Sequence, residues 1–489
     1  MPIRKLEPKN VWTNFYSLTQ IPRPSGHTAQ VADFLVKFGK GLGLESFKDE
    51  CGNVIIRKPA TKGMEGRKGI VLQSHMDMVP QKNNDTVHDF KKDPIKTRIV
   101  KEADGEWVYA TGTTLGADDG LGIAAAMSVL ESKTIKHGPV EALFTVDEET
   151  GMFGALALKP NVLKGEILLN LDSETEGELY VGCAGGLDAN ITLKYKKAPM
   201  PEGYVPYQIN VTGLRGGHSG MEINEGRGNS NKVLARVLLP MVRNLRGKLI
   251  SFNGGNMRNA IPREAEAVIA LPKTRENAGS KIVAGILATL RSELAKIDPN
   301  VSITFAPAVG KYKHVIAGRT GLKLLQALYA CPNGVDRMSL EMKDLVETSN
   351  NLAIVNTNED TITVKTLLRG ATDSLKEDLA EGVRAAFELV GAKVVFDGGY
   401  SGWSPNLKSP ILKTMKTQYK KLYGKEPACM AIHAGLECGI FGKSYPEWDM
   451  ISCGPTLKSP HSPDERAYVP SVEKWWKFIV AVLENAPAK

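Results

Sequence analysis

Five short polar motifs in this chain supply side chains that could bind divalent metal ions. They are Ser-His-Met-Asp at 74–77, Gly-Ala-Asp-Asp-Gly at 116–120, Asp-Glu-Glu-Thr-Gly at 147–151, Leu-Asp-Ser-Glu at 171–174 and Pro-His-Ser at 460–462. Imidazole and carboxylate ligands without a cysteine suit Zn²⁺, Mn²⁺ or Co²⁺, and are typical of an open catalytic site rather than a closed structural one. The motifs therefore predict a hydrolase site that holds two metal ions.

The charges of these motifs support that prediction. Four carboxylates, those of Asp118, Glu148, Glu149 and Asp172, would repel one another strongly if they met in one crevice of low dielectric constant. Two divalent ions supply four positive charges, and histidines that bind as neutral imidazoles complete the coordination without adding charge. The total charge of such a cluster is then close to zero.

Three of the motifs directly follow apolar runs, at 69–72, 140–146 and 166–171. These runs have the length and composition of buried parallel strands. In an open α/β sheet, ligands collect at the carboxyl ends of the strands, so residues far apart in the sequence can meet in one crevice.

The pattern along the chain predicts a mixed-sheet α/β catalytic domain interrupted by an inserted α+β lid domain, because 489 residues exceed what one core usually organises. Helix and strand patterns alternate in the first part, with helices near 31–42 and 121–131. The middle part alternates strand-like runs with amphipathic helices at 232–245, 281–295 and 375–389. We expect a first catalytic segment at 1–187, the lid at 188–398 and a second catalytic segment at 399–489. The lid is large enough for two similar halves, although no sequence repeat proves duplication.

Composition argues against two classes of partner. The formal charge is +8, but lysines are spread along the chain and no basic run interleaves with aromatic residues, so we expect no nucleic-acid partner. No apolar stretch approaches the ~20 residues of a membrane helix, and the start lacks the apolar region of a signal peptide, so we expect no membrane partner. Six cysteines without a Cys-x-x-Cys pair favour free thiols, and hence a cytoplasmic protein.

The motifs, taken together and in order, resemble the M20 metallopeptidases. His-x-Asp, Gly-x-Asp-Asp, Asp-Glu-Glu-x-Gly and Asp-x-Glu form the signature, and the resemblance covers nearly the whole chain. The long lid and the segment His-Ala-Gly-Leu-Glu-Cys-Gly at 433–439 point to the aminoacyl-histidine dipeptidase branch. The resemblance implies a fold of metallo-exopeptidase type and a small peptide as the substrate.

The resemblance also implies a role for each motif residue. Asp118 would bridge two divalent ions, with His75 and Asp172 on one ion and Glu149 and His461 on the other. The ions would be Zn²⁺ first of all, with Mn²⁺ or Co²⁺ as alternatives. Two such ions share and acidify a water molecule and polarise a carbonyl group. Glu148 would be the general base, and the peptide between Asp118 and Asp119 would be cis.

Asp77 is expected to orient His75. It lies two residues further along, so in an extended chain both side chains fall on the same face. A carboxylate that holds the distal N–H of a ligand imidazole fixes the orientation of the ring and raises its basicity.

The lid contributes two polar, turn-rich segments, 216–220 and 256–262. By resemblance, His218 would donate a hydrogen bond to the developing oxyanion. The expected substrate contacts are Asn256, Arg258, Asn259, His433 and Glu437, with Arg258 and Asn259 at the terminal carboxylate. A homodimer through the lid is also expected, and the sequence leaves open whether His218 acts within its own chain or across that dimer.

Each motif alone has a simpler interpretation. His75 and Asp77 could be a surface pair, Glu148 and Glu149 a solvated helix start, and Asp172 a helix cap. The segment 217–220 could be only a flexible turn. Together and in order, the motifs favour a dipeptidase that acts on unblocked Xaa-His and other dipeptides. The alternatives are an N-acyl amino-acid deacylase or tripeptidase of the same family, and a non-catalytic binding module on the same fold.

Overall fold

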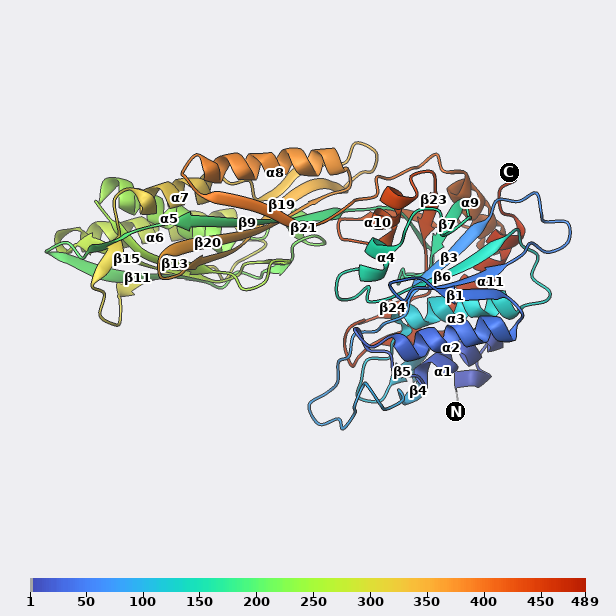
Figure 1. Ribbon diagram of the computed structural model, residues 1–489. Helices are drawn as coiled ribbons and strands as arrows, with labels where there is room; N and C mark the ends of the chain where they lie inside the picture. The colour runs from blue at the N-terminus through green and yellow to red at the C-terminus, as the bar shows by residue number, and fades with distance from the viewer. Residues whose placement is uncertain (1–2) are drawn as a thin grey trace. The chain divides into compact units, whose positions relative to one another are not determined.

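A computed structural model describes residues 3–489 and divides the chain into two compact units (Figure 1). Unit 1 runs to Gly182 and resumes at Pro405–Ala431 and Leu436–Lys489, while unit 2 comprises Cys183–Ser404 and Ile432–Gly435. The expected boundaries were 187/188 and 398/399. The first differs because strand β9, which begins at Gly185, already belongs to the sheet of unit 2. The second differs because strand β21 of the same sheet runs on to Tyr400. Residues 1 and 2 of the expected first segment lie outside the described residues.

The centre of unit 1 is an eight-stranded sheet in the order β1-β2-β6-β3-β7-β23-β8-β22. Strands β3 (Ile70–His75), β6 (Val140–Thr145) and β7 (Ile167–Asn170) are parallel and buried at every residue. They are the apolar runs that the sequence analysis identified. Their register pairs His75 with Thr145 and Gln73 with Asn170, so their carboxyl ends lie at one edge of the sheet.

The other strands of unit 1 belong to the same large sheet or to a separate four-stranded sheet. The other strands of the large sheet are β1 (Glu45–Lys48), β2 (Val54–Lys58), β8 (Glu178–Cys183), β22 (Ala428–Ile432) and β23 (Asp449–Ser452). A separate four-stranded sheet has the order β24-β25-β5-β4, with bounds Leu457–Lys458, Arg466–Tyr468, Gly105–Ala110 and Thr97–Glu102. The turn between β24 and β25 carries the last motif.

Helix α3 (Ala117–Glu131) packs against β3, β6 and α1. It is buried all the way from Ala117 to Leu130, which explains why the sequence shows no polar face there. The helix was expected from 121, but its first turn begins at Ala117 and is irregular at Asp118 and Asp119. The Gly-Ala-Asp-Asp-Gly motif is therefore a distorted helix start.

The remaining helices of unit 1 flank the sheets. Helix α2 packs on β1 and β2, and α9 packs on β23 and α11. The bounds are η1 (Ile3–Lys5), α1 (Lys9–Thr19), α2 (Ala29–Gly41), α4 (Phe153–Ala157), α9 (Pro410–Tyr423), α10 (Glu437–Ser444) and α11 (Val469–Glu484).

Unit 2 consists of two βαββαβ halves that share one antiparallel sheet. The first half contains β11, α5, β13, β15, α6 and β16, and the second contains β9, α7, β19, β20, α8 and β21. Each half has the same internal strand order, since the sheet runs β16-β11-β15-β13 and then β19-β20-β9-β21. The two halves that the lid was large enough to contain are present, joined where β13 pairs with β19.

The bounds of these elements fit the amphipathic patterns of the sequence. The strands are β9 (Gly185–Lys194), β11 (Tyr204–Thr212), β13 (Lys248–Gly254), β15 (Ala265–Pro272), β16 (Ser302–Pro307), β19 (Val346–Thr357), β20 (Thr361–Gly370) and β21 (Lys393–Tyr400). The helices are α5 (Ser230–Asn244), α6 (Glu276–Glu293), α7 (Thr320–Ala330) and α8 (Asp373–Glu388). Helix α7 was not predicted. The apolar faces of the helices and of the sheet form one core within this unit.

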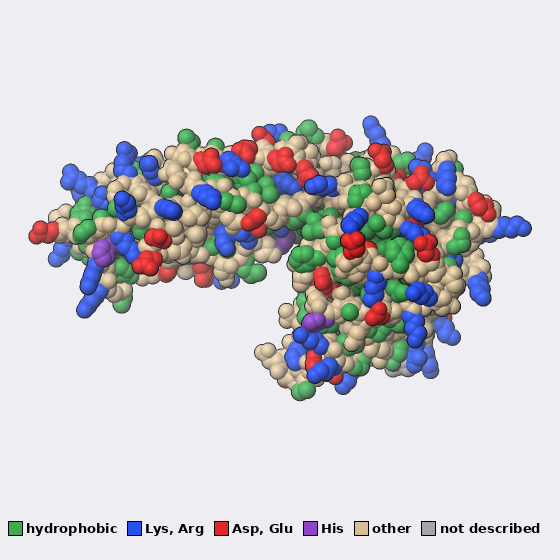
Figure 2. Space-filling model, in the orientation of Figure 1, with side chains coloured by type: hydrophobic (Ala, Val, Ile, Leu, Met, Phe, Trp, Pro, Cys, Tyr) green, Lys and Arg blue, Asp and Glu red, His purple; other side chains and the backbone are tan. Residues whose placement is uncertain are grey.

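Unit 2 also contains several short strands and two short 3-10 helices. They are β10 (Lys197–Pro199), β12 (Gly217–His218), β14 (Ala260–Ile261), β17 (His314–Ile316), β18 (Gly334–Met338), η2 (Ile223–Glu225) and η3 (Lys273–Arg275). On the face drawn in Figure 2, Lys and Arg side chains are interspersed with acidic ones over both units. Within residues 3–489, the helices are all too short or too polar to cross a membrane. The mixed α/β class expected from the sequence is confirmed.

Candidate metal centre

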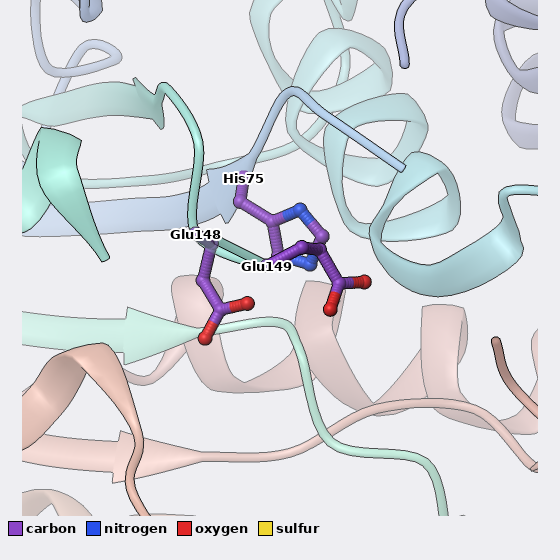
Figure 3. Close-up of side chains that lie close together, drawn as sticks. All are labelled: His75, Glu148 and Glu149. Atoms are coloured by element: carbon purple, nitrogen blue, oxygen red, sulfur yellow. The ribbon is translucent and has the colours of Figure 1, made fainter. Parts of the chain in front are cut away.

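The five motifs of unit 1 meet at the carboxyl edge of its large sheet. His75 ends β3, Asp118 lies in the first turn of α3, and Glu148 and Glu149 follow β6. Asp172 follows β7, and His461 lies between β24 and β25. Figure 3 shows the carboxyl groups of Glu148 and Glu149 beside the imidazole of His75. The peptide between Asp118 and Asp119 is cis, as the family resemblance implies.

Asp118 is shared between two groups of candidate ligands. Nε2 of His75 lies 3.0 Å from Oδ1 of Asp118 and 3.3 Å from Oδ1 of Asp172. Nε2 of His461 lies 3.2 Å from Oδ2 of Asp118 and 3.0 Å from Oε1 of Glu149. Each carboxylate oxygen of Asp118 therefore faces a different imidazole.

These separations fit coordination to metal ions. Two ligand atoms that each lie about 2.0 to 2.1 Å from a tetrahedral zinc ion are roughly 3.3 Å apart. The observed separations of 3.0 to 3.3 Å are close to that value. Each group also supplies only three protein ligands, which leaves a coordination position for water or substrate.

The two groups differ in their exposure to solvent. The side chain of His75 is 1% exposed, whereas that of His461 is 51% exposed. Asp118, Glu149 and Asp172 are nearly as buried as His75. The group around His75 is thus enclosed, and the group around His461 opens to solvent on one side.

Burial and mutual repulsion shift the pKa values of this cluster. Burial raises the pKa of Glu148 to about 8 and that of Asp119 to about 8. Hydrogen bonds to Asp118 and Glu149 raise the pKa of His461 to about 11. Burial opposes the charged form of His75, but Asp172 and Asp118 outweigh it and raise the pKa of that imidazole. Without cations, the cluster therefore retains protons near neutral pH.

We expect the metal-free protein to lose stability as pH rises from about 5 to about 8. A carboxyl group whose pKa is higher in the folded protein than in the unfolded chain stabilises the fold below its ordinary pKa, and this contribution is lost as pH rises through the raised value. The pKa of Glu148 is raised in this way, to about 8 in the folded protein. The pKa of the His461 imidazolium, which is paired with carboxylates, is raised as well. Thermal unfolding of chelated protein across this range measures the effect.

Added zinc should reverse that trend, because the ligands must be deprotonated to bind metal. The increase in unfolding temperature produced by zinc should therefore grow with pH. A metal-free protein whose unfolding temperature is constant or rises over this range would contradict the assignment of the cluster.

Asp77 contacts His75 and also fixes the loop that carries the acidic pair. Its Oδ1 lies 3.4 Å from Nδ1 of His75. The same carboxylate accepts hydrogen bonds from the backbone N–H groups of Glu148 (3.0 Å) and Glu149 (3.4 Å) and from the hydroxyl of Ser25 (2.7 Å). The spacing in the sequence predicted the first contact but not the others. Asp77 thus contacts both His75 at the end of β3 and the backbone of Glu148 and Glu149 after β6.

Glu437 is a buried carboxylate at the start of α10. It is fully buried, and it accepts hydrogen bonds from Nε2 of Gln73 (2.5 Å) and from the hydroxyl of Thr145 (2.9 Å). Burial raises its pKa to about 7. Its Oε1 has no hydrogen-bond partner within the described residues, and its expected contact with substrate stays a prediction.

Unit 2 carries a separate polar cluster around His218. Nδ1 of His218 accepts hydrogen bonds from the backbone N–H groups of Gly220 (3.2 Å) and Met221 (3.0 Å). The neutral imidazole must therefore carry its proton on Nε2. Burial and the positive charge of Arg369 lower the pKa of His218, which favours that neutral form. His218 is thus built to donate one hydrogen bond from Nε2.

His433 and Arg369 belong to the same cluster of unit 2. Nε2 of His433 lies 2.7 Å from the hydroxyl of Ser349, and burial lowers the pKa of His433 to about 3. Arg369 is 5% exposed, and its Nε has no hydrogen-bond partner within the described residues. A Cβ atom on Gly220 would meet the carbonyl of His433, so only glycine fits between these side chains. The cluster therefore contains an enclosed cation with spare donor capacity.

The other predicted contacts of unit 2 take different positions. The guanidinium of Arg258 is paired with Asp188 (Nε to Oδ2, 3.1 Å) and donates to Asn190 (2.8 Å). Asn256 and Asn259 are exposed in the loop between β13 and β14. The carbonyl of Asn259 accepts the N–H of Ser219, which attaches this loop to the His218 segment. Arg258 is thus already paired within unit 2, whereas Nε of Arg369 has no hydrogen-bond partner in the part of the chain that the structure describes.

Arg369 was not predicted from the sequence. It lies in β20, whose pattern is that of an ordinary strand, and no neighbouring residue marks it. Burial of an arginine beside two histidines becomes visible only when the chain is folded.

Comparison with known proteins identifies the family. A sequence profile described as peptidase family M20/M25/M40 matches residues 71–485. The chain is 44% identical over 487 residues to the cytosol non-specific dipeptidase of Escherichia coli K12, covering 100% of this chain and 99% of that protein.

Solved structures agree with this result. The aminoacylhistidine dipeptidase of Vibrio alginolyticus superimposes with a TM-score of 0.94 at 45% identity, covering 100% of this chain and 99% of that one. The aminopeptidase PepT of Bacillus cereus shares the fold, with a TM-score of 0.58 at 18% identity over 98% of this chain. The resemblance inferred from the motifs is confirmed, and the chain belongs to peptidase family M20/M25/M40.

Proposed function

We propose that this chain is a dipeptidase that hydrolyses unblocked dipeptides, Xaa-His among them, with two divalent metal ions that are Zn²⁺ in the native protein. The observation that carries the proposal is the position of Asp118, which offers one oxygen to each of two three-ligand groups. The names of the two full-length relatives, a non-specific dipeptidase and an aminoacylhistidine dipeptidase, support the substrate class. Membership of the family makes the chain a metal-dependent hydrolase.

Metal ions bound by these groups supply an activated water molecule and a polarised substrate carbonyl. Glu148 is suited to take the proton of that water, because it lies beside His75 and Glu149 without belonging to either group that contains Asp118. Its backbone N–H is held by Asp77, which sets the direction of the side chain. The same carboxyl group then returns the proton to the departing amine.

The cluster of unit 2 supplies two groups that suit a dipeptide. Nε2–H of His218 is a donor for the oxygen that gains negative charge at the reacting carbonyl. Arg369 is an enclosed cation whose Nε has no hydrogen-bond partner among the described residues, which suits the terminal carboxylate of the substrate. In this role we propose Arg369 in place of Arg258, whose charge is paired with Asp188.

The substitution His218→Ala should lower kcat by about 100 to 1,000-fold, the usual cost of losing one oxyanion donor. Metal content should not change, since His218 belongs to neither ligand group. His314→Ala is the matched control, because His314 is an exposed histidine of unit 2. Steady-state kinetics and elemental analysis of both variants measure the effect. A kcat within a few-fold of the parent value would remove the oxyanion role from His218.

A substrate panel tests the proposed function as a whole. Metal-free protein is reloaded with Zn²⁺, Mn²⁺ or Co²⁺ and assayed with free dipeptides, acetylated amino acids and tripeptides. Hydrolysis of free dipeptides, with Xaa-His among the substrates, is the expected result. Preference for acetylated amino acids or tripeptides would favour the deacylase or tripeptidase alternative, and no metal-dependent turnover would favour a binding module.

The proposal extends to the cellular location of the protein and to its oligomeric state. The E. coli relative is named as a cytosol enzyme, which supports a cytoplasmic location. A homodimer formed through unit 2 remains our expectation from the sequence, and sedimentation analysis of the full chain tests it.

A further inference from the structure

Glu465 is a buried carboxylate that binds the segment leading into Asp118. It is 2% exposed. Its Oε2 accepts hydrogen bonds from the backbone N–H groups of Leu115 (2.7 Å) and Gly116 (3.0 Å). Its Oε1 accepts those of Ala117 (2.7 Å) and Asp118 (3.3 Å). One side chain thus satisfies four successive N–H groups at the irregular start of α3, where a helix lacks internal acceptors.

Arg23 holds the same segment from the opposite side of the peptide. It is 2% exposed, and Nη1 donates to the carbonyls of Met76 (2.8 Å) and Asp77 (3.0 Å). Nη2 donates to the carbonyl of Gly116. The carbonyl of Gly116 is therefore bound by Arg23 while its N–H is bound by Glu465.

The glycines of the Gly-Ala-Asp-Asp-Gly motif make room for this arginine. A Cβ atom would lie 2.7 Å from Nη2 of Arg23 at Gly116, and 2.6 Å from it at Gly120. Gly116 also has a φ of +68°, which disfavours any other residue. The motif thus encodes both the metal ligand Asp118 and the space for Arg23.

Arg23 and Glu465 together connect three of the segments that carry proposed metal ligands. Arg23 joins the residues after His75 to the residues before Asp118. Glu465 joins that second segment to the chain that carries His461, four residues earlier in the sequence. Asp118 shares an ion with each of these histidines in the proposed centre, so its position depends on both connections.

We propose that Arg23 and Glu465 are positioning residues that set Asp118 between the two metal ions, an inference that rests on the proposed function. Neither side chain is a metal ligand. Their effect on the ions passes through the backbone of residues 115–118, which they fix from two sides. Loss of a partner that orients a ligand typically weakens metal affinity by about 10 to 100-fold.

The variant Glu465→Gln tests the proposal, because an amide of the same shape places an NH₂ donor against the N–H groups. We expect zinc affinity to fall about 10 to 100-fold in competition with a chelator. The visible absorption spectrum of the cobalt-loaded protein should also shift, since it reports the geometry of the ligands. The variant Arg23→Lys should weaken affinity in the same direction, because lysine keeps the charge but loses the forked donors.

Glu141→Gln is the matched control. Glu141 is also buried, and it accepts the backbone N–H groups of Lys164 (2.7 Å) and Gly165 (2.8 Å), but it lies on β6 near the opposite end from the metal cluster. It should lower thermal stability and leave zinc affinity and the cobalt spectrum unchanged.

Parental zinc affinity and an unchanged cobalt spectrum in folded Glu465→Gln would overturn the proposal. If that variant does not fold, the same result in Arg23→Lys would overturn it. Failure of the proposed function would be distinct, because the parent protein itself would then bind fewer than two ions or show no metal-dependent turnover.

Discussion

Replacement of Glu148 by alanine or glutamine should lower kcat by about 100 to 10,000-fold, the usual contribution of a positioned acid–base group. Metal content should stay at the parental value. Glu148 lies outside the two groups that share Asp118, and its carboxyl group lies beside His75 and Glu149. Its backbone remains held by Asp77 in both variants, so the acidic loop should keep its position.

Measurements of kcat and of bound metal on the same samples separate the possible roles of Glu148. Glu148→Asp keeps a carboxylate with a shorter reach and should recover part of the lost rate. Glu50→Gln is a surface control, since Glu50 is an exposed residue paired only with Lys159. Loss of metal together with activity in Glu148→Gln would make Glu148 a ligand, and a rate within tenfold of the parent would remove it from the chemistry.

Most of the metal cluster was predictable from local signals in the sequence. The apolar runs became β3, β6 and β7, and the ligands at their ends are brought together by the parallel register of those strands. His461 is different, since no strong strand precedes it in the sequence. Its motif was singled out for its ligand type, its role at one ion was implied by the family resemblance, and its position depends on a small separate sheet.

The residues that support the ligands were not predictable. Arg23, Glu437 and Glu465 are charged, and charged residues are rarely buried unless they are paired or hydrogen-bonded. Their partners are backbone groups or side chains far away in the sequence, such as Gly116 for Arg23 and Gln73 for Glu437. No local pattern reports such contacts, so a single sequence does not predict the burial of these residues.

In unit 2, part of the fold likewise could not be predicted from the sequence. The amphipathic helices were found, but the match between its two halves lies in the strand order and not in the residues. Helix α7 was missed even though five of its residues are buried. The sequence pointed to Arg258 and not to Arg369 for a related reason. Arg258 stands in a polar segment but is paired with Asp188, while Arg369 stands in an ordinary strand and has spare donors.

Replacement of Asp118 by asparagine should remove one of the two metal ions. The amide keeps one oxygen for one ligand group, but it presents an NH₂ donor to the other and carries no charge. Activation of water and carbonyl by the ions contributes several kcal/mol, so kcat should fall by at least about 1,000-fold. Elemental analysis at equal zinc concentration should show about one ion per chain in the variant and two in the parent.

Asp298→Asn provides the control that separates this loss from general destabilisation. Asp298 is a fully buried aspartate of unit 2 that accepts the backbone N–H groups of Arg215 (2.7 Å) and Gly228 (2.7 Å). Its replacement should lower the unfolding temperature without changing the zinc content, because it contacts none of the ligands. Among the described candidates, Asp118 is the only residue that belongs to both the His75 group and the His461 group. Of these two variants, only Asp118→Asn should therefore change both the metal count and kcat. Two tightly bound zinc ions in Asp118→Asn would mean that the ions do not share this carboxylate.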